Sequence, residues 1–203
     1  MLITVTGFKG GVTKTTTAVH VAAYLVSSAP AVLVDGDPNR SARKWARRGK
    51  FPFEVVDETL AAKVARQYEH VVFDTEGRPG KGDLELLAEG CDLMIVPITP
   101  DPMALDTLPE LIDELKRIAP DKYKLLLTRV PPPPQKEGEE VRQLLLEAGL
   151  PLFAVSIRER KAFRIAALQG VPVYEARQPG SETRYPGALE GWEEYRAALE
   201  EIV

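Results

Sequence analysis

The first 26 residues constrain the fold most, because they join a short apolar strand to a glycine-rich loop and then to a helix. Residues 2–5 predict a buried strand, and residues 18–26 have the composition of a helix. Between them, Gly10 and Gly11 lack a Cβ atom, so the backbone can bend until successive N–H groups point inward at an anion. The helix begins where that anion would lie, and the positive end of its dipole adds to the attraction. This stretch therefore predicts a phosphate-binding loop.

Two side chains of the loop suit the phosphates of a nucleotide. Lys14 can reach the β- and γ-phosphates, and the hydroxyl of Thr15 can bind a magnesium ion. The general pattern G-x-x-x-x-G-K-[ST] is matched imperfectly, because Phe8 and Thr13 stand where it has glycines. The alternative is a glycine turn with two solvated lysines, which the helix that follows directly disfavours.

A narrower pattern fits the loop better. The run Lys9-Gly10-Gly11-x-x-Lys14-Thr15 has a lysine at each end and resembles the deviant Walker A motif of the ParA/MinD group of P-loop ATPases. The resemblance implies ATP and Mg2+ as cofactors and catalytic roles for Lys9 and Lys14, with Lys9 reaching the phosphates of a second subunit. It also implies a set of ATP-binding residues in this loop and after a later strand: Lys9, Gly10, Gly11, Val12, Thr13, Lys14, Thr15, Thr16, Thr128 and Arg129. The family usually carries an asparagine where Thr128 stands, so selectivity for the base is open.

Acidic residues follow two further apolar runs. Asp35 and Asp37 follow the first run and Asp74 the second, at the carboxyl ends of predicted strands, where open α/β sheets bind ligands. Carboxylates there can hold magnesium through water or orient an attacking water, although a solvated Asp-Gly-Asp-Pro turn is an alternative. The first segment is similar to the Walker A′ motif of the ParA family, which implies that Asp37 is catalytic and positions the hydrolytic water. The resemblance implies a metal site formed by Thr15, Asp37 and Asp74.

Apolar runs and helical patterns alternate along the chain. They predict an α/β fold with a mostly parallel, doubly wound sheet and helices on both faces, as in P-loop NTPases. Strands are expected at residues 2–5, 31–34, 51–56, 70–74, 92–97, 124–130 and 150–156. Helices are expected at residues 58–68, 84–88, 105–118 and 188–202, with Leu60, Val64 and Tyr68 facing inward in the first of these. Residues 76–82 contain three glycines and predict a mobile loop that senses the γ-phosphate, with a plain surface turn as the alternative.

The size of the chain limits its organisation. With 203 residues, 44% of them hydrophobic, it is long enough for one α/β domain over residues 1–203 and too short for two. Its one cysteine, Cys91, excludes an internal disulfide and a four-cysteine metal site. No basic-then-apolar leader precedes the first strand, and no apolar run approaches the roughly 20 residues that span a bilayer. We therefore expect a cytoplasmic protein that does not bind membranes.

Basic residues gather in two places, although the net charge of −4 argues against a bulk nucleic-acid binder. Residues 40–50 carry six positive charges and no acid, which suits a solvated helix face, the more common case, or contact with phosphate. A second group lies before or within a predicted helix that ends at Gly170. Residues 162–173 there are similar to the small plasmid-partition ATPases, and the resemblance implies that the group binds DNA without sequence preference. It consists of Arg158, Arg160, Lys161 and Arg164.

The resemblance to the ParA family covers nearly the whole chain. It implies a magnesium-dependent ATPase that forms a homodimer around ATP, binds DNA on the nucleoid and hydrolyses ATP when a ParB-like or other adaptor protein stimulates it. Such a cycle segregates DNA or positions another cargo. A MinD-like membrane ATPase is an alternative, but residues 190–203 are acidic and anionic lipid would repel them. Two further alternatives are a metabolic ATP-dependent ligase or kinase of related fold, and a nucleotide-binding regulator without turnover.

Overall fold

The loops that carry the predicted site residues follow the carboxyl ends of strands in one β-sheet. The computed structural model describes residues 1–7, 10–77, 80–101, 106, 108–119 and 121–202. The strands in these ranges are β1 (Leu2–Val5), β2 (Ala31–Asp35), β3 (Glu54–Asp57), β4 (His70–Asp74), β5 (Leu93–Ile98) and β6 (Tyr123–Leu127). They pair in parallel in the order β3-β2-β4-β1-β5-β6. The expected α/β fold with a doubly wound parallel sheet is confirmed.

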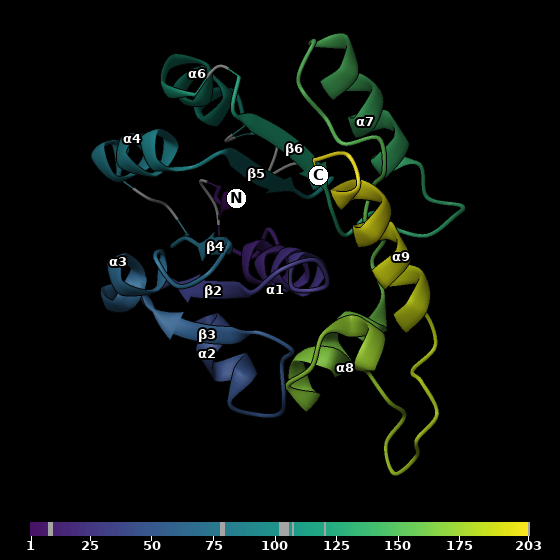
Figure 1. Cartoon of the computed structure of the whole chain (residues 1–203). Coiled ribbons are helices and arrows are strands. Elements are labelled where there is room, and N and C mark those ends of the chain that lie inside the picture. Colours follow the sequence, from purple (N-terminus) through teal and green to yellow (C-terminus); the bar gives the residue numbers. More distant parts are fainter. Residues whose placement is uncertain (8–9, 78–79, 102–105, 107, 120, 203) are drawn as a thin grey trace.

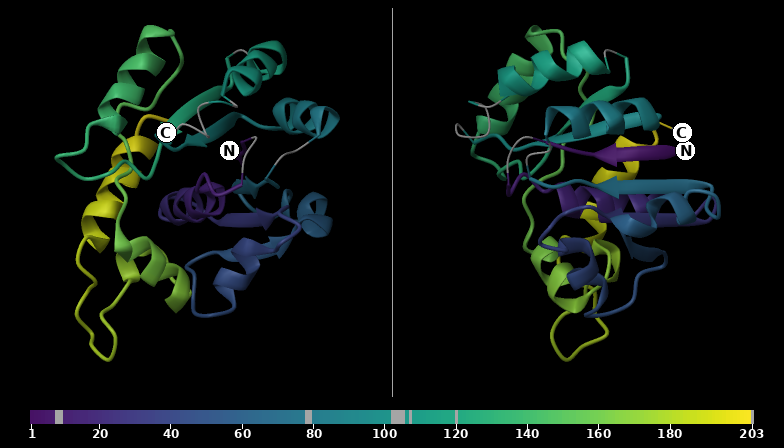
Figure 2. Two further views of the ribbon diagram at one scale, coloured as in Figure 1. Left: turned by 180° about the vertical axis from the view of Figure 1, so that it is seen from behind. Right: turned by 90° about the vertical axis from the view of Figure 1, so that its left-hand side faces the viewer.

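Helices cover both faces of this sheet (Figure 1). The α-helices of the described ranges are α1 (Lys14–Leu25), α2 (Ser41–Ala46), α3 (Ala61–Val64), α4 (Lys81–Gly90), α6 (Leu108–Ile118), α7 (Glu137–Glu147), α8 (Lys161–Gln169) and α9 (Ala188–Leu199). Short 3-10 helices lie at Glu58–Leu60 and Val173–Glu175. One core cluster joins α1, α2, α8 and α9 to the sheet, and two others join α3, α4, α6 and α7 to its opposite face. Figure 2 shows the layers from two further directions.

The strands are apolar on both faces, as a sheet covered on both sides requires. In β2, Leu33 belongs to the cluster with α1, whereas Val32 and Val34 belong to the cluster with α3. All three side chains are fully buried. The continuous apolar run therefore follows from the alternation of side chains across a sheet that has helices on either face.

The register of the central strands brings the predicted acidic residues together. Asp74 of β4 pairs with Val5 on one side and with Asp35 on the other. Because β1 also ends at Val5, the loop that follows it leaves the sheet beside both aspartates. Parallel pairing thus places the phosphate loop and the two acidic strand ends on one edge of the sheet.

Two predicted elements are wrong. Residues 58–68 do not form one helix: a 3-10 turn is followed by the one-turn helix α3, Leu60 is 44% exposed, and only Val64 of the expected inward trio is buried. Residues 150–156 form only a bridge at Leu152 beside β6: the N–H of Phe153 donates to Leu125 O, but the next bond, to Leu127 O, comes from Ile157 where a regular parallel ladder would use residue 155.

Several boundaries also differ from the expected ones. Helix α1 begins at Lys14, and β6 ends at Leu127, two residues before the positive φ of 52° at Arg129 turns the backbone away from the strand direction. The expected helix start at residue 105 and part of the predicted loop at residues 76–82 lie outside the described residues. None of the helices that the structure describes combines the length and the apolar character needed to cross a bilayer.

Candidate nucleotide-binding site

The loop between β1 and α1 turns sharply at two residues with positive φ, Gly11 at 82° and Thr13 at 67°. Gly10 and Gly11 are exposed, whereas Val12 is only 5% exposed. Lys14, Thr15 and Thr16 form the first turn of α1. Phe8 and Lys9 lie outside the described residues, so the structure does not test the prediction that Lys9 contacts ATP.

A hollow of about 600 Å3 adjoins the loop and brings most of the predicted residues together. Asp37 lines this hollow together with residues of the loop and the start of α1: Gly10, Gly11, Thr13, Lys14, Thr15 and Thr16. A second hollow, of about 580 Å3, is lined by Val12 and Arg129, and a third, of about 260 Å3, by Thr128 and Arg129. Since these hollows share loop residues, they adjoin one another around the end of the loop.

Asp74 is a buried carboxylate without a partner. It is 0% exposed, and neither of its oxygens accepts a hydrogen bond within the described part of the chain. Burial raises its pKa to about 7, the nearby charge of Asp35 adds to this, and the Thr15 hydroxyl and the Lys14 ammonium oppose it. An unpaired buried carboxylate is unfavourable, and a cation or a cation-bound water beside it would remove that penalty. Asp74 and Thr15 therefore fit a magnesium ion.

The described residues contain no group of three or more His, Cys, Asp or Glu side chains arranged to hold a metal. Magnesium keeps several waters and is usually held by one or two carboxylates together with phosphate oxygens. Asp74 does not line the 600 Å3 hollow, and Asp37 does. Asp74 lines a different hollow, of about 410 Å3, and the joint role of the two aspartates as metal ligands stays a prediction.

Lys14 lies close enough to both aspartates to feel their charges, and it is 8% exposed. Burial lowers the pKa of its ammonium group, while the negative charges of Asp74 and Asp37 raise it. The amine is thereby held among groups that favour its charged form, at the first residue of α1. A phosphate at this position would meet a partly desolvated cation, and such a charge interacts more strongly than one in water.

Asp35 and Asp37 have different surroundings. Asp35 is fully buried and accepts the N–H of Asp37 at 3.2 Å and that of Arg43 at 2.9 Å, and burial raises its pKa. It anchors the turn and the first residues of α2. Asp37 accepts Nδ2 of Asn39 at 3.1 Å on one oxygen and the hydroxyl of Ser41 at 3.0 Å on the other, so its carboxylate is fixed at the rim of the hollow.

Sequence reasoning did not name Asn39, Ser41 or Arg48 as site residues, and of the basic stretch that contains Lys44 it predicted only possible contact with phosphate. Asn39 and Ser41 orient Asp37, and their signal was present, since small polar residues two and four positions after an aspartate in a turn commonly bond to it. Lys44 and Arg48 of the basic stretch at residues 40–50 line the same hollow. The sequence signal for Lys44 and Arg48 was a run of basic residues without acids. No sequence pattern shows which face of a short helix points into the hollow.

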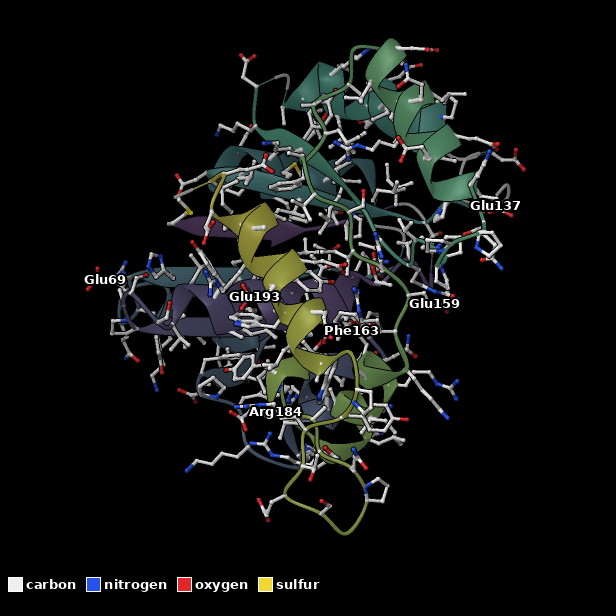
Figure 3. All side chains as sticks on the ribbon, turned by 90° about the vertical axis from the view of Figure 1, so that its right-hand side faces the viewer. Glu69, Glu137, Glu159, Phe163, Arg184 and Glu193 are labelled. Carbon is white, nitrogen blue, oxygen red and sulfur yellow. The ribbon has the colours of Figure 1, made fainter. Side chains whose placement is uncertain are left out.

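The four predicted DNA-binding residues differ in exposure. Arg158, Lys161 and Arg164 are exposed at or beside the start of α8. The side chain of Arg160 is 16% exposed, and both of its terminal nitrogens donate to the carboxylate of Glu194 in α9. Figure 3 shows α9 crossing the sheet, with Phe163 of α8 beneath it and Glu159 on the segment that leads to α8. Arg160 therefore ties α8 to α9, Arg158 lies 3.9 Å from the same Glu194 carboxylate through its Nε, and Lys161 and Arg164 are exposed.

Comparison with known proteins agrees with this geometry. Residues 3–173 match the model of the CobQ/CobB/MinD/ParA nucleotide binding domain. The chain is 34% identical over 208 residues to the maintenance of carboxysome distribution protein A of Gloeobacter kilaueensis, covering 99% of this chain and 93% of the relative. Apo McdA from Cyanothece superposes with a TM-score of 0.73 at 16% identity, with 98% of each chain covered. MinD from Pyrococcus horikoshii, solved as a complex with Mg-ADP, superposes with a TM-score of 0.68 at 18% identity, covering 99% of this chain and 95% of that one. The chain belongs to the CobQ/CobB/MinD/ParA family of nucleotide-binding proteins.

Proposed function

We propose that this protein is a magnesium-dependent ATPase that forms a homodimer around ATP, binds DNA without sequence preference and releases it after hydrolysis, which a ParB-like or other adaptor protein stimulates. Its task is to position a cargo. We also propose that residues 1–203 act as a single domain. The observation that carries the proposal is Asp74, a buried carboxylate without a hydrogen-bond partner among the described residues, beside Thr15 and Lys14 at the end of a phosphate loop.

Binding of the nucleotide follows from the loop and the start of α1. The backbone N–H groups from Gly10 to Thr16 lie at the N-terminal end of a 12-residue helix, where the helix dipole favours anions. Lys14 adds a charge that is already partly desolvated. Thr15 and Asp74 would hold Mg2+, which would neutralise charge on the phosphates. These groups bind the triphosphate and orient it toward the hollow.

Asp37 is suited to orienting the attacking water. Its carboxylate lines the hollow beside Lys14, and the bonds from Asn39 and Ser41 fix its position. One oxygen can accept a hydrogen bond from a water while the other remains bonded to Ser41. The side chain thereby selects one water geometry, which raises the rate by reducing the orientational freedom of the nucleophile.

The dimer would supply the remaining positive charge. Lys9, by resemblance to the deviant Walker A motif, would reach the phosphates of the partner subunit and stabilise the charge that develops in the transition state. The second and third hollows leave room for the rest of the nucleotide beside Arg129.

A basic surface on α2 and α8 supports binding to DNA. The indole Nε1 of Trp45 donates to Val171 O at 3.1 Å and Arg48 donates to Ala167 O at 3.0 Å, which holds the two helices together. Residues 40–53 and 160–174 contain no acid. The exposed basic residues of this surface are Lys44, Arg47, Arg48, Lys50, Arg158, Lys161 and Arg164. Together they offer a polyanion a positive surface on a chain whose net charge is −4.

The nature of the cargo separates two versions of this function. The full-length similarity to a protein named for carboxysome distribution favours a protein body as the cargo, whereas the basic helix at residues 161–169 resembles plasmid-partition ATPases, whose cargo is DNA. The neighbouring reading frame, and the location in cells of a fluorescent fusion relative to nucleoid and cargo, distinguish the two.

Membrane binding through the last helix has little support. Tyr195 and Leu199 of α9 are buried against the core, so this apolar face is not available to lipid. Its exposed side carries Glu193 and Glu200. Pelleting with anionic vesicles in the presence of Mg-ATP tests this alternative, and sedimentation of the protein would support it.

The proposed activity is tested by comparing the wild type with Asp37→Ala and with Asp113→Ala, which removes an exposed carboxylate on α6. We expect Asp37→Ala to bind Mg-ATP and form dimers in size measurements while phosphate release falls by at least a hundredfold. Asp113→Ala should match the wild type. Normal hydrolysis by Asp37→Ala would remove Asp37 from the mechanism, and a wild type that remains monomeric with a non-hydrolysable ATP analogue would overturn the dimer.

A further inference from the structure

Two threonines that depart from the family pattern contact each other in the structure. Thr13 stands where the general phosphate loop has glycine, and Thr128 where the family usually has asparagine. The hydroxyl of Thr13 donates to that of Thr128 at 2.9 Å. We propose that this Thr13–Thr128 pair positions the end of the phosphate loop, and that Thr128 therefore acts on the phosphates through the loop and does not read the base. The proposal deepens the proposed function, on whose nucleotide site it rests.

Thr13 needs such a partner because its backbone is strained. It has φ 67° and ψ 21°, the left-handed region in which a β-branched residue is disfavoured by about 1–2 kcal/mol. It precedes α1, a position where a threonine hydroxyl normally accepts a bond from the helix, and it makes no such bond. Its carbonyl accepts the N–H of Thr17 at 2.8 Å and so starts the helix. The side chain that would otherwise cap α1 is instead directed across the sheet to Thr128.

Thr128 can hold Thr13 because it is itself firmly fixed. It is 1% exposed, and its N–H donates to Ile98 O at 2.7 Å. Its hydroxyl also donates to Ile98 O, at 3.1 Å. The end of the phosphate loop is thereby connected to the ends of β5 and β6.

The hydrogen bonds of Thr128 leave it nothing to donate to a base. A hydroxyl has one hydrogen, and Thr128 uses it on Ile98 O. One of its lone pairs is occupied by Thr13. An asparagine at this position would present both a donor and an acceptor to the edge of adenine, as paired recognition of a base requires. Loss of the Thr13–Thr128 pair should therefore weaken the binding of all nucleoside triphosphates equally.

The test is a double-mutant cycle with Thr13→Ala and Thr128→Val, read out as affinity for non-hydrolysable analogues of ATP and of GTP with Mg2+. We expect each single variant to lose about fivefold in affinity for both analogues, the double variant to lose no more than either, and the ratio between the two analogues to stay within twofold of the wild type. Thr13→Ser retains the hydroxyl and should rescue most of the affinity that Thr13→Ala loses. Independent losses that multiply in the double variant, or a changed ratio in Thr128→Val, would overturn the proposal.

Two controls separate this proposal from the proposed function. Thr183→Ala breaks a matched hydroxyl pair, since Ser181 donates to Thr183 at 3.0 Å in an exposed turn, and it should change neither affinity. The same cycle is also measured by denaturant unfolding without nucleotide, where the two substitutions should again be non-additive. If the wild type binds neither analogue, the proposed function fails. The unfolding cycle then still tests the Thr13–Thr128 pair, and additive effects of the two substitutions on stability would overturn it.

Discussion

His20 is a buried histidine whose ring packs in the core and whose two ring nitrogens both form hydrogen bonds. It is fully buried in α1, and its ring stacks on that of Tyr195 with centroids 4.7 Å apart. The N–H of Val173 donates to Nε2 at 3.0 Å, so Nδ1 carries the ring hydrogen and donates it to Thr16 O at 2.6 Å. Both nitrogens are used by the neutral ring, which links the start of α1 to the segment that follows α8.

Protonation of His20 should therefore destabilise the fold at acidic pH. Burial lowers its pKa from 6.5 to about 4, so the unfolded chain binds the proton first as the pH falls. Stability contributed by the neutral ring is complete above pH 6.5 and declines toward pH 4, by about 3 kcal/mol in total. Urea unfolding at pH 7.5 and at pH 5 measures this loss. His20→Gln should show a smaller difference between the two pH values, and an equal difference would contradict the assignment.

The buried carboxylate of Asp74 lowers the stability of the protein when no ligand is bound. Replacing it by asparagine removes a buried charge with no hydrogen-bond partner among the described residues. We expect Asp74→Asn to raise the free energy of unfolding at pH 8 by about 1 kcal/mol while it removes the magnesium-dependent part of nucleotide affinity. Unfolding without ligand and nucleotide titration with and without Mg2+ measure the two effects. A variant less stable than the wild type, or one with unchanged magnesium dependence, would argue against this role.

At the scale of elements, the packing of α2 on α8 depends on two glycines. Gly170 ends α8 with φ 74°, and an added Cβ would lie 2.1 Å from the backbone nitrogen of Gly49. Neither atom can move without shifting the backbone of one helix against the other. The contact between the two basic helices therefore requires a hydrogen atom in place of a side chain at Gly170.

Gly170→Ala should lower the free energy of unfolding by about 3 kcal/mol or more. The left-handed backbone conformation and the overlap of the new Cβ with the Gly49 backbone both contribute to this loss. Gly180→Ala is the matched control, because its φ of 69° is similar and a Cβ there would have no atom within 4 Å. The control should lose only about 1 kcal/mol. Equal losses in urea unfolding would show that close packing at Gly170 contributes nothing.

At the scale of the whole molecule, the uneven distribution of charge supports a link between the proposed binding of nucleotide and the proposed binding of DNA. Lys44 and Arg48 line the same hollow as Asp37, and α2 is held to the Asp37 turn through Asp35. A dimer would carry two copies of the basic surface, and two linked contacts bind one polymer far more tightly than one. The affinity for DNA should therefore depend on ATP through assembly.

We expect a non-hydrolysable ATP analogue to raise the affinity for duplex DNA at least tenfold, and Lys9→Ala to abolish this gain while the monomer keeps its weak binding. Arg164→Ala and Arg47→Ala should each reduce the slope of log affinity against log salt by about 1 for every phosphate contact removed. Lys63→Ala, an exposed lysine on α3, is the control and should leave the slope unchanged. Equal affinities with and without the analogue would contradict the proposed coupling.

The sequence by itself determined the phosphate loop, the order of strands and helices along the chain, and the fold class. These depend on short-range spacing: glycines next to Lys14, apolar runs of strand length, and acids directly after them. It failed at residues 58–68 and 150–156, where regular structure depends on whether a partner element completes the core or the ladder.

Only the tertiary structure decided how the predicted residues divide their roles. Asp35 and Asp74 have the same position at the ends of neighbouring strands, yet the Asp35 carboxylate accepts backbone N–H groups, whereas the Asp74 carboxylate accepts no hydrogen bond in the described residues. Arg160 is held by Glu194, and Thr13 meets Thr128 across 115 residues. Such contacts join segments far apart in the chain, so their partners depend on strand order and helix packing, which no local pattern contains.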